Sequence, residues 1–327
     1  MGCNTLFPPK YPSCSPFIAP LFSFATAHPS SIHRTMASET TSKKLIWLIT
    51  GCSSGFGLAM ARLVQANGHH VIATSRNPGR TPELVEEITS KGGEWARLDQ
   101  DESNCGQVIE DFEARGTAID VLVNVAGFGM TGPVESFSDE EAHRIFETNF
   151  FGPYRLMRAA APHMRKRRSG MIVNFSSGSG MEARRSLGLY GASKSALDGL
   201  TKTFHQEMKE FNVRVLLVYL GTFNTPMVGK VEPKLKPLDP DYNGTFTGKL
   251  YEIMGSGNFK VPGDHIKATQ AIYYVVVGEG IGKGKEEEMM LPLGVDMAAR
   301  VEEVRSGFDH MMDVFGDICN NVNVENA

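Results

Sequence analysis

From Leu45 onward, short apolar runs alternate with longer segments in which apolar side chains recur every three or four residues. The short runs predict strands at 45–50, 69–75, 95–99, 120–127, 170–177, 213–220 and 288–294. The longer segments predict helices near 56–67, 82–91, 104–115, 139–166, 189–211 and 263–277. Strands that are apolar on both faces and alternate with helices are typical of a parallel sheet covered on both sides. With right-handed crossovers, the pattern predicts an α/β fold, a doubly wound parallel sheet of about seven strands.

The stretch from 44 to 327 contains neither an internal repeat nor a linker-like segment, so we expect a single domain there. Residues 226–262 interrupt the alternation, because they are rich in proline and glycine. They also carry aromatic side chains such as Tyr242 and Phe246. A long loop in a globular domain is usually functional or disordered. The apolar and aromatic content of this loop favours a substrate lid or pocket wall over plain disorder.

The first 43 residues differ in composition from the rest, with six prolines and no acidic residue before Glu39. We interpret residues 1–43 as a disordered leader, or as an upstream extension before a start at Met36. The apolar stretch 17–27 resembles a weak secretory core, but Pro20 interrupts it. A transit peptide would contain more arginine than the single Arg34, so organelle targeting by residues 1–35 is the weaker alternative.

Composition narrows the class of protein. The chain has 327 residues, a net charge of −4 and no basic face, so we expect no nucleic-acid partner. No apolar run approaches the roughly 18 residues that would predict a membrane span. The five cysteines form no C-x-x-C pair and the histidines show no metal-ligand spacing, so we expect neither a disulfide framework nor a metal. A reducing, cytoplasmic location follows as the expectation.

The segment TGCSSGFG (50–57) joins the first predicted strand to the first predicted helix. Gly51, Gly55 and Gly57 would let the backbone approach a phosphate closely. The helix N-terminus that follows offers unpaired N–H groups and the positive end of its dipole. A strand, glycine-rich turn and helix in this order predict a pyrophosphate site of a dinucleotide.

The second predicted strand ends in ATSRNP, without the acidic residue that would bind the ribose hydroxyls of NAD. Ser75 stands at that position, and Arg76 follows it. A carboxylate would repel a 2′-phosphate, whereas a guanidinium can form a charge-assisted hydrogen bond to it. We therefore predict NADP(H) as the cofactor; the alternative is that Arg76 is a solvated residue at the strand end.

Four polar residues suggest chemistry. Tyr190 and Lys194 lie one helical turn apart in LYGASKSAL, where an ammonium ion would lower the pKa of a phenol. Ser177 ends a predicted strand, the place where ligands bind in open α/β sheets. Asn149 lies inside a predicted helix, where its propensity is unfavourable. A phenol with a tuned pKa can exchange a proton with an alcohol or carbonyl oxygen.

Taken in order and spacing, these motifs resemble the short-chain dehydrogenase/reductases, firmly over 44–227 and loosely over 228–315. The matching segments are TGCSSGFG, NVAG (124–127), Asn149, the serine pair 176–177 and YGASK (190–194). The resemblance implies a Rossmann-type sheet and a catalytic tetrad of Asn149, Ser177, Tyr190 and Lys194. In that tetrad Tyr190 would be the acid/base, and Ser177 would polarise the carbonyl. Lys194 would lower the phenol pKa and hold the nicotinamide ribose, while Asn149 would hold a water in a proton relay.

The glycine loop and the resemblance together imply a larger set of cofactor-binding residues. They are Gly51, Ser53, Ser54, Gly55, Phe56, Gly57, Ser75, Arg76, Asp99, Asn124, Ala126, Gly127, Tyr190, Lys194, Gly221 and Thr225. By resemblance, Asp99 would meet the adenine amino group, Asn124 would hold the turn after the fourth strand, and Thr225 would meet the nicotinamide carboxamide. Two departures, Val125 and Leu220, lie beside these positions and leave the tetrad intact.

These residues predict an NADP(H)-dependent oxidoreductase. It would transfer hydride between nicotinamide and a carbonyl or secondary alcohol of a mid-sized hydrophobic substrate. Two alternatives stay open: a non-catalytic NADP(H)-binding redox sensor or scaffold, and a lyase or epimerase that keeps its cofactor. The long helices predicted at 139–166 and 189–211 resemble those through which this family forms homodimers and homotetramers.

Overall fold

The structure is a computed structural model, which describes residues 43–225, 232–233, 237–256 and 261–322 of the unit Lys43–Ala327. The predicted leader therefore lies, up to residue 42, outside the described residues. Parts of the predicted lid lie outside them as well.

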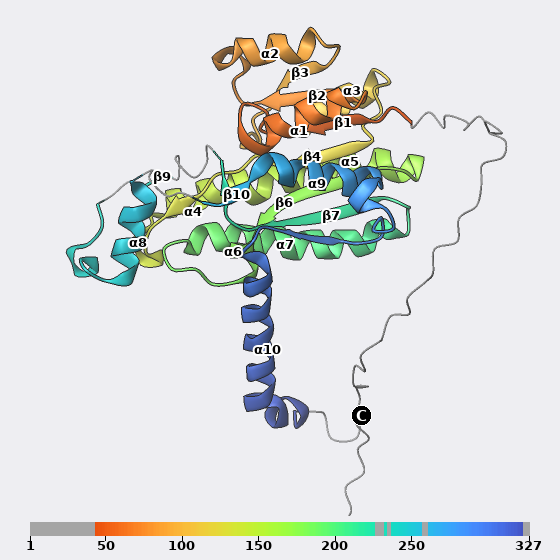
Figure 1. The fold of residues 1–327 in the computed structure, drawn as a ribbon. Coiled ribbons are helices and arrows are strands. Elements are labelled where there is room, and N and C mark those ends of the chain that lie inside the picture. Colours follow the sequence, from red (N-terminus) through yellow and green to blue (C-terminus); the bar gives the residue numbers. More distant parts are fainter. Residues whose placement is uncertain (1–42, 226–231, 234–236, 257–260, 323–327) are drawn as a thin grey trace, which may run out of the picture. The chain divides into compact units, whose positions relative to one another are not determined.

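Seven parallel strands form the central sheet (Figure 1). They are β1 (Ile46–Ile49), β2 (His70–Ser75), β3 (Glu94–Arg97), β4 (Val121–Asn124), β6 (Met171–Ser177), β7 (Arg214–Leu220) and β11 (Met290–Leu293). Their spatial order is β11-β7-β6-β4-β1-β2-β3. The chain crosses from one half of the sheet to the other between β3 and β4, so the carboxyl ends of β1 and β4 flank a topological switch point. The doubly wound sheet predicted from the sequence is confirmed.

The strands bury both of their faces. In β1, Trp47 and Ile49 belong to one apolar cluster, and Leu48 between them belongs to the other. The neighbouring β4 follows the same alternation in register, with Val121 beside Trp47 and Leu122 beside Leu48. The helices α1 (Gly55–Ala66), α2 (Pro82–Thr89) and α9 (His265–Val277) cover the first face. The helices α3 (Gln107–Ala114), α5 (Gly152–Arg167) and α7 (Gly188–Lys209) cover the second.

The segment predicted as a helix at 139–166 is helical throughout, but its helix type changes for one turn. It begins as α4 (Asp139–Phe146). Ser138 and Glu141 form a capping box at the start of this helix. A single π-helical turn, Glu147–Phe151, follows and leads directly into α5. Such turns often occur at functional sites, and this one contains Asn149.

Shorter elements join these layers. They are the helix α6 (Gly178–Met181), the strand pairs β5 (Met130–Thr131) with β9 (Glu232–Pro233) and β8 (Phe223–Asn224) with β10 (Gly263–Asp264), and the 3-10 turns Pro78–Arg80, Val134–Ser136, Pro240–Tyr242 and Gly280–Gly282. Within the predicted lid, residues 246–255 form a helix, α8 (Phe246–Gly255), that the sequence pattern did not predict.

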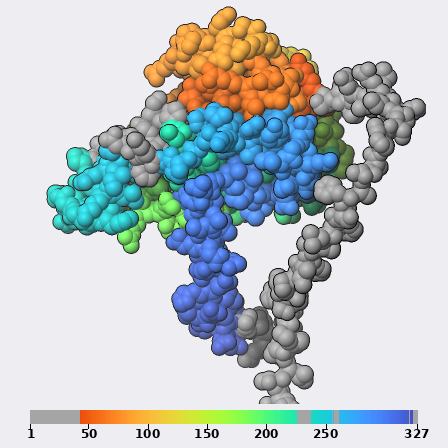
Figure 2. Space-filling model, viewed as in Figure 1, coloured from red at the N-terminus to blue at the C-terminus, as the bar shows by residue number. Residues whose placement is uncertain are grey.

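The C-terminal helix α10 (Met297–Asn320) was likewise not predicted. Figures 1 and 2 show it leaving the rest of the fold beside α6. Among the described residues, no helix combines the length and the apolarity needed to cross a bilayer.

Candidate active site

The glycine loop after β1 has the conformation that its sequence requires. Gly51 and Gly55 have φ angles of +70° and +55°, which residues with a Cβ rarely adopt. A Cβ on Gly57 would lie 2.4 Å from the Gly51 carbonyl oxygen. Only glycine therefore lets α1 begin this close to the end of β1. The unpaired N–H groups of the first turn of α1 lie next to this loop and suit a phosphate.

The buried Thr50 side chain ties this loop to the end of β4. Its hydroxyl accepts hydrogen bonds from the backbone N–H groups of Val125 and Ala126, both at 3.0 Å. It also donates to the Val123 carbonyl at 3.3 Å. Because one side chain holds both turns, the ends of the two strands at the switch point keep a constant separation.

A cavity of about 700 Å³ opens at these strand ends. Most residues predicted from the sequence line it: Gly51, Ser53, Ser54, Gly55, Phe56, Gly57, Ser75, Arg76, Asp99, Ala126, Gly127, Ser177, Tyr190, Lys194, Gly221 and Thr225. The two exceptions are Asn124 and Asn149, which are buried and are not among its lining residues. The fold thus brings positions far apart in the sequence to a single cavity.

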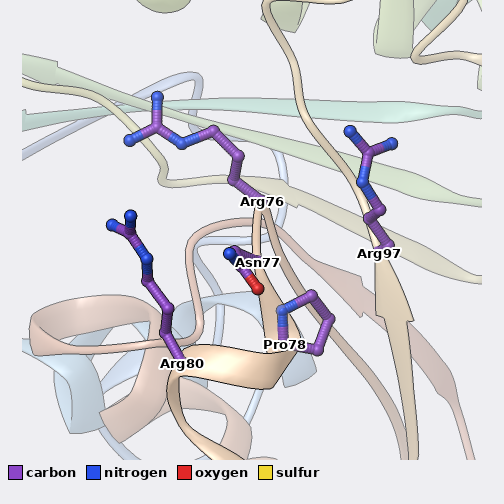
Figure 3. Close-up of a pocket in the computed structure, with 5 residues that line it drawn as sticks. All are labelled: Arg76, Asn77, Pro78, Arg80 and Arg97. Carbon is purple, nitrogen blue, oxygen red and sulfur yellow. The ribbon is translucent and has the colours of Figure 1, made fainter.

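At one end of the cavity, arginines gather beyond β2. Arg76, Asn77, Pro78, Arg80 and Arg97 line an adjoining pocket of about 470 Å³ (Figure 3). Arg97 is paired with Glu102 at 2.6 Å, and Arg76 lies 4.0 Å from Asp101. Among the described residues, no carboxylate lies within ion-pair distance of Arg80.

The Ser75 hydroxyl is buried and accepts a hydrogen bond from the Trp95 indole at 3.0 Å. The hydroxyl hydrogen itself is not used in this bond and can be donated to a ligand, since a hydroxyl both donates and accepts. Asp99, also predicted at this end, accepts a hydrogen bond from the Asp101 N–H at 3.2 Å and lines the cavity.

Ser177 and Tyr190 line the middle of the cavity. Ser177 ends β6, and its hydroxyl accepts a hydrogen bond from the Ser179 N–H at 3.2 Å. Tyr190 lies in the first turn of α7. Burial raises the pKa of Tyr190 above its ordinary value, while the Ser177 hydroxyl and the Arg300 guanidinium act to lower it. The Asp198 carboxylate acts to raise it further. The effect of Lys194 on this pKa, expected from the sequence, stays a prediction.

Lys194 lies one turn after Tyr190 on α7 and is buried. Its ammonium group donates to the Phe175 carbonyl at 2.9 Å. Burial lowers the pKa of Lys194 to about 8, and the nearby Asp198 carboxylate opposes this shift. A Cβ on Gly127 would lie 3.5 Å from the Lys194 Nζ and 2.9 Å from the Asn149 Oδ1. The absence of a side chain at Gly127 leaves room for a ligand beside the ammonium group.

Asn149 connects the π-helical turn to two neighbours. Its side-chain oxygen accepts from the Phe128 N–H at 3.1 Å, and its amide donates to the Phe128 carbonyl at 3.0 Å. The same amide group donates to the Ser193 hydroxyl at 3.1 Å. Ser193 in turn donates to the Tyr190 carbonyl at 2.8 Å. Asn149 therefore joins the loop after β4 to the helix that carries Tyr190 and Lys194.

The end of β7 is closed by residues of the C-terminal helix. A Cβ on Gly221 would lie 2.1 Å from an Asp296 carboxylate oxygen. Asp296 accepts from the Thr222 hydroxyl at 2.8 Å and pairs with Arg300 at 2.7 Å. Arg300 also pairs with Glu182 at 3.1 Å, and it lines the cavity.

Beyond Tyr190 the wall mixes apolar and cationic groups. Phe128, Leu187, Leu250 and Met254 line the cavity, the last two from α8. Arg185 also lines it, with its guanidinium 5.0 Å from the Phe246 ring centre. Of these residues, the sequence pointed to Phe246 and Met254 within the predicted lid. It missed Phe128, Leu187, Leu250 and Arg185, as well as Arg300. An apolar repeat after residue 297 could have indicated α10, but nothing in the local sequence shows that Arg300 reaches Tyr190.

A family model described as short chain dehydrogenase matches residues 45–236, more than half of the chain. Oxidoreductase claN from Passalora fulva is 41% identical over 180 residues, which are 55% of this chain and 82% of that protein. 3-Ketodihydrosphingosine reductase from Bacteroides thetaiotaomicron is 37% identical over 184 residues, which are 55% of this chain and 64% of that protein. The match to this second relative thus spans less than two thirds of its length.

Solved structures share the fold. A short-chain dehydrogenase from Streptomyces avermitilis has a TM-score of 0.75 at 30% identity, over 88% of this chain and all of that one. A metagenomic short-chain oxidoreductase in complex with NADP has a TM-score of 0.51 at 33% identity, over 54% of this chain and 82% of that one. A Burkholderia phymatum enzyme in complex with NAD has a TM-score of 0.67 at 20% identity, over 88% of this chain and 99% of that one. With its doubly wound sheet, its glycine loop and the family match over residues 45–236, the chain belongs to the short-chain dehydrogenase family.

Proposed function

We propose that this protein is an NADP(H)-dependent oxidoreductase that interconverts a carbonyl and a secondary alcohol in a mid-sized hydrophobic substrate. One observation carries the proposal. Ser177, Tyr190 and Lys194 line the same cavity as the glycine loop, so a bound nicotinamide and a reacting oxygen can meet there. Family membership supports oxidoreductase chemistry on CH–OH and C=O groups.

The residues fit a dinucleotide. The close approach of Gly57 to Gly51 leaves backbone N–H groups for a pyrophosphate. Lys194 would hold the nicotinamide ribose, and Thr225 the carboxamide. When bound, the nicotinamide supplies hydride to a carbonyl carbon or accepts it from an alcohol carbon.

The protein's own groups handle the proton. In reduction, the Tyr190 hydroxyl gives its proton to the substrate oxygen; in oxidation, the Tyr190 phenolate takes that proton back. The Ser177 hydroxyl donates a hydrogen bond to the same oxygen and stabilises the negative charge that develops on it. Because burial raises the pKa of Tyr190, the phenol is protonated at neutral pH and can serve as the acid in reduction.

Arg76 and Arg80 support the preference for NADP(H). Both line the end of the cavity next to β2, where Ser75 replaces the acidic residue that NAD would require. A 2′-phosphate would gain charge-assisted hydrogen bonds from these guanidinium groups. The wall formed by Phe128, Leu250 and Met254 supports an apolar substrate.

The proposed oligomer is a homodimer or homotetramer formed through α4, α5 and α7. Phe151, at the end of the π-helical turn, and Tyr154, in the first turn of α5, are exposed aromatic residues, with 41% and 37% of their surfaces accessible. Exposed aromatic side chains of this kind are enriched at protein interfaces.

The proposed chemistry is tested by Tyr190→Phe, which removes only the hydroxyl. The turnover of a panel of hydrophobic ketones, followed through the absorbance of NADPH, should fall by about 100-fold or more. The affinity for NADPH, measured by its fluorescence, should stay within a few-fold of wild type. Tyr154→Phe, which lies on the surface of α5, serves as the matched control.

Two results would contradict the proposal. Wild-type turnover that survives in Tyr190→Phe would remove the phenol from the chemistry. Tight NADPH binding without turnover of any ketone or alcohol by the wild type would instead indicate a redox sensor.

A further inference from the structure

Most of α10 is exposed. The helix has 24 residues, but only its first turn is anchored, through the buried Met297 and the ion pairs of Arg300. Beyond Arg300, nearly every side chain described is exposed. Figure 2 shows the helix as a separate column of dark blue atoms.

The exposed part carries a continuous apolar stripe. Its members alternate in spacing between three and four residues: Val301, Val304, Phe308, Met311, Phe315 and Ile318 in the helix, and Val322 two residues after its end. These are the a and d positions of a heptad repeat, which place side chains along one face of a helix. Phe308, Phe315 and Ile318 expose 61%, 55% and 63% of their surfaces. We call these seven residues the α10 stripe.

Such a stripe is costly in water. Given the exposed fractions, its side chains leave on the order of 700 Å² of surface open, more than the roughly 300–600 Å² of the largest patch on a typical monomer. The helix also contains Gly307 and Gly316, and glycine costs about 1 kcal/mol relative to alanine inside a helix. A helix of this composition derives its stability from packing rather than from propensity. The α10 stripe is therefore expected to be covered.

We propose that the α10 stripe is covered by the same helix of a second copy of this chain. A heptad spacing fits another helix, because knobs at a and d enter holes on a helical partner. Two copies would bury about 1,400 Å² together, within the roughly 1,200–2,000 Å² of a stable interface.

The positions beside the stripe permit self-association. The flanking e and g positions are Arg305, Gly307, Met312, Val314, Cys319 and Asn321. Only Arg305 among them is charged, so two copies can pair without a row of like charges along the seam. Where an interface is selective for a different partner, these positions commonly carry complementary charges.

The polar face of α10 disfavours a lipid surface. It carries Glu302, Glu303, Asp309, Asp313 and Asp317. Helices that lie on membranes usually present lysine and arginine on this face, which anionic headgroups attract. An acidic face would be repelled instead.

The test compares the full chain with the double variant Phe308→Asp/Phe315→Asp. Sedimentation velocity over a range of concentrations should show the double variant at a lower association state than wild type. Phe308→Leu/Phe315→Leu keeps the seam apolar and should associate as wild type does. Ser306→Asp, which adds one charge on the opposite face, is the matched control. None of these residues contacts the cavity, so NADPH-dependent turnover confirms that each variant is folded.

Two outcomes would overturn the inference. One is an equal mass for wild type and the aspartate double variant at every concentration. The other is co-sedimentation of wild type with phosphatidylcholine vesicles that the aspartates abolish while the mass stays the same, which would assign the stripe to a lipid surface. Association through α5 alone would leave the mass of the double variant equal to that of wild type. A lower mass of the double variant therefore assigns association to α10, and an equal mass does not.

Discussion

At the end of β2, a serine followed by an arginine replaces the carboxylate that would bind the ribose hydroxyls of NAD. The sequence pointed to Ser75 and Arg76, and both line the cavity. The structure adds Arg80, which lies one 3-10 turn further on, beside Arg76 (Figure 3). It also shows that the Ser75 hydroxyl is already engaged by Trp95. The guanidinium groups rather than the serine should therefore carry most of the recognition of a 2′-phosphate.

We expect Arg76→Gln and Arg80→Gln each to raise the KM for NADPH by roughly 10- to 100-fold. A hydrogen bond to a charged group contributes about 1.5–3 kcal/mol, and glutamine retains little of it. The KM for NADH should change little, because NADH lacks the 2′-phosphate. Steady-state kinetics with both cofactors measure the difference.

Arg62→Gln is the control for these substitutions, since Arg62 is paired with Glu87 on the surface and does not line the cavity. A wild-type preference for NADH would remove the basis of the prediction. An equal loss of affinity for both cofactors in the variants would point to a structural role of the arginines.

At the scale of the elements, the segment from Ser138 to Arg167 shows what apolar periodicity cannot predict: a local change of helix type. Its apolar spacing predicted one helix, and most of the segment is helical. The π-helical turn at Glu147–Phe151 adds a residue that the pattern does not reveal. Asn149 occupies this turn and forms hydrogen bonds to both backbone groups of Phe128. We infer that these bonds, made to a distant loop, offset the poorer helical geometry.

Asn149→Ala should lower the free energy of unfolding by on the order of 3 kcal/mol. The partly buried N–H and C=O groups of Phe128 would lose their partners, and an unpaired polar group shielded from water costs about 1–3 kcal/mol. Turnover should fall as well, because the link from Phe128 through Ser193 to Tyr190 is broken. Urea unfolding and ketone reduction measure the two effects.

Asn104→Ala, on an exposed turn, should leave both quantities within error of wild type. A stable and fully active Asn149→Ala variant would show that the π-helical turn does not depend on this side chain.

At the scale of the whole molecule, the C-terminal helix reaches the cavity lined by Ser177 and Tyr190. Arg300 in the first turn of α10 pairs with Glu182 and Asp296, and a Cβ on Gly178 would lie 2.3 Å from its Nη1. Gly178 directly follows Ser177. The Arg300 charge acts to lower the pKa of Tyr190.

Arg300→Met should move the pH dependence of alcohol oxidation to higher pH. Oxidation needs the Tyr190 phenolate, and without the cation the pKa of Tyr190 rises further above its ordinary value. The rate at pH 8 should therefore fall, while ketone reduction, which uses the protonated phenol, should persist to higher pH. Rate profiles in both directions between pH 6 and pH 10 measure the shift.

Arg300→Lys keeps a positive charge and should restore most of the profile. Loss of the ion pairs will also lower the melting temperature of Arg300→Met. A variant that is less stable but has an unchanged pH profile would limit Arg300 to a structural role.

The sequence by itself determined the alternation of the seven sheet strands with the helices that cover them, and the chemistry of the glycine loop. It did so because these depend on local features: apolar periodicity, the conformational freedom of glycine, and the one-turn spacing of Tyr190 and Lys194. The tertiary structure alone decided which distant groups meet. It brought Arg300 and Tyr190 to the lining of one cavity, engaged Ser75 with Trp95, and introduced the turn that carries Asn149. Such pairings arise from the packing of segments far apart in the chain, where burial and charge act through space rather than along the sequence.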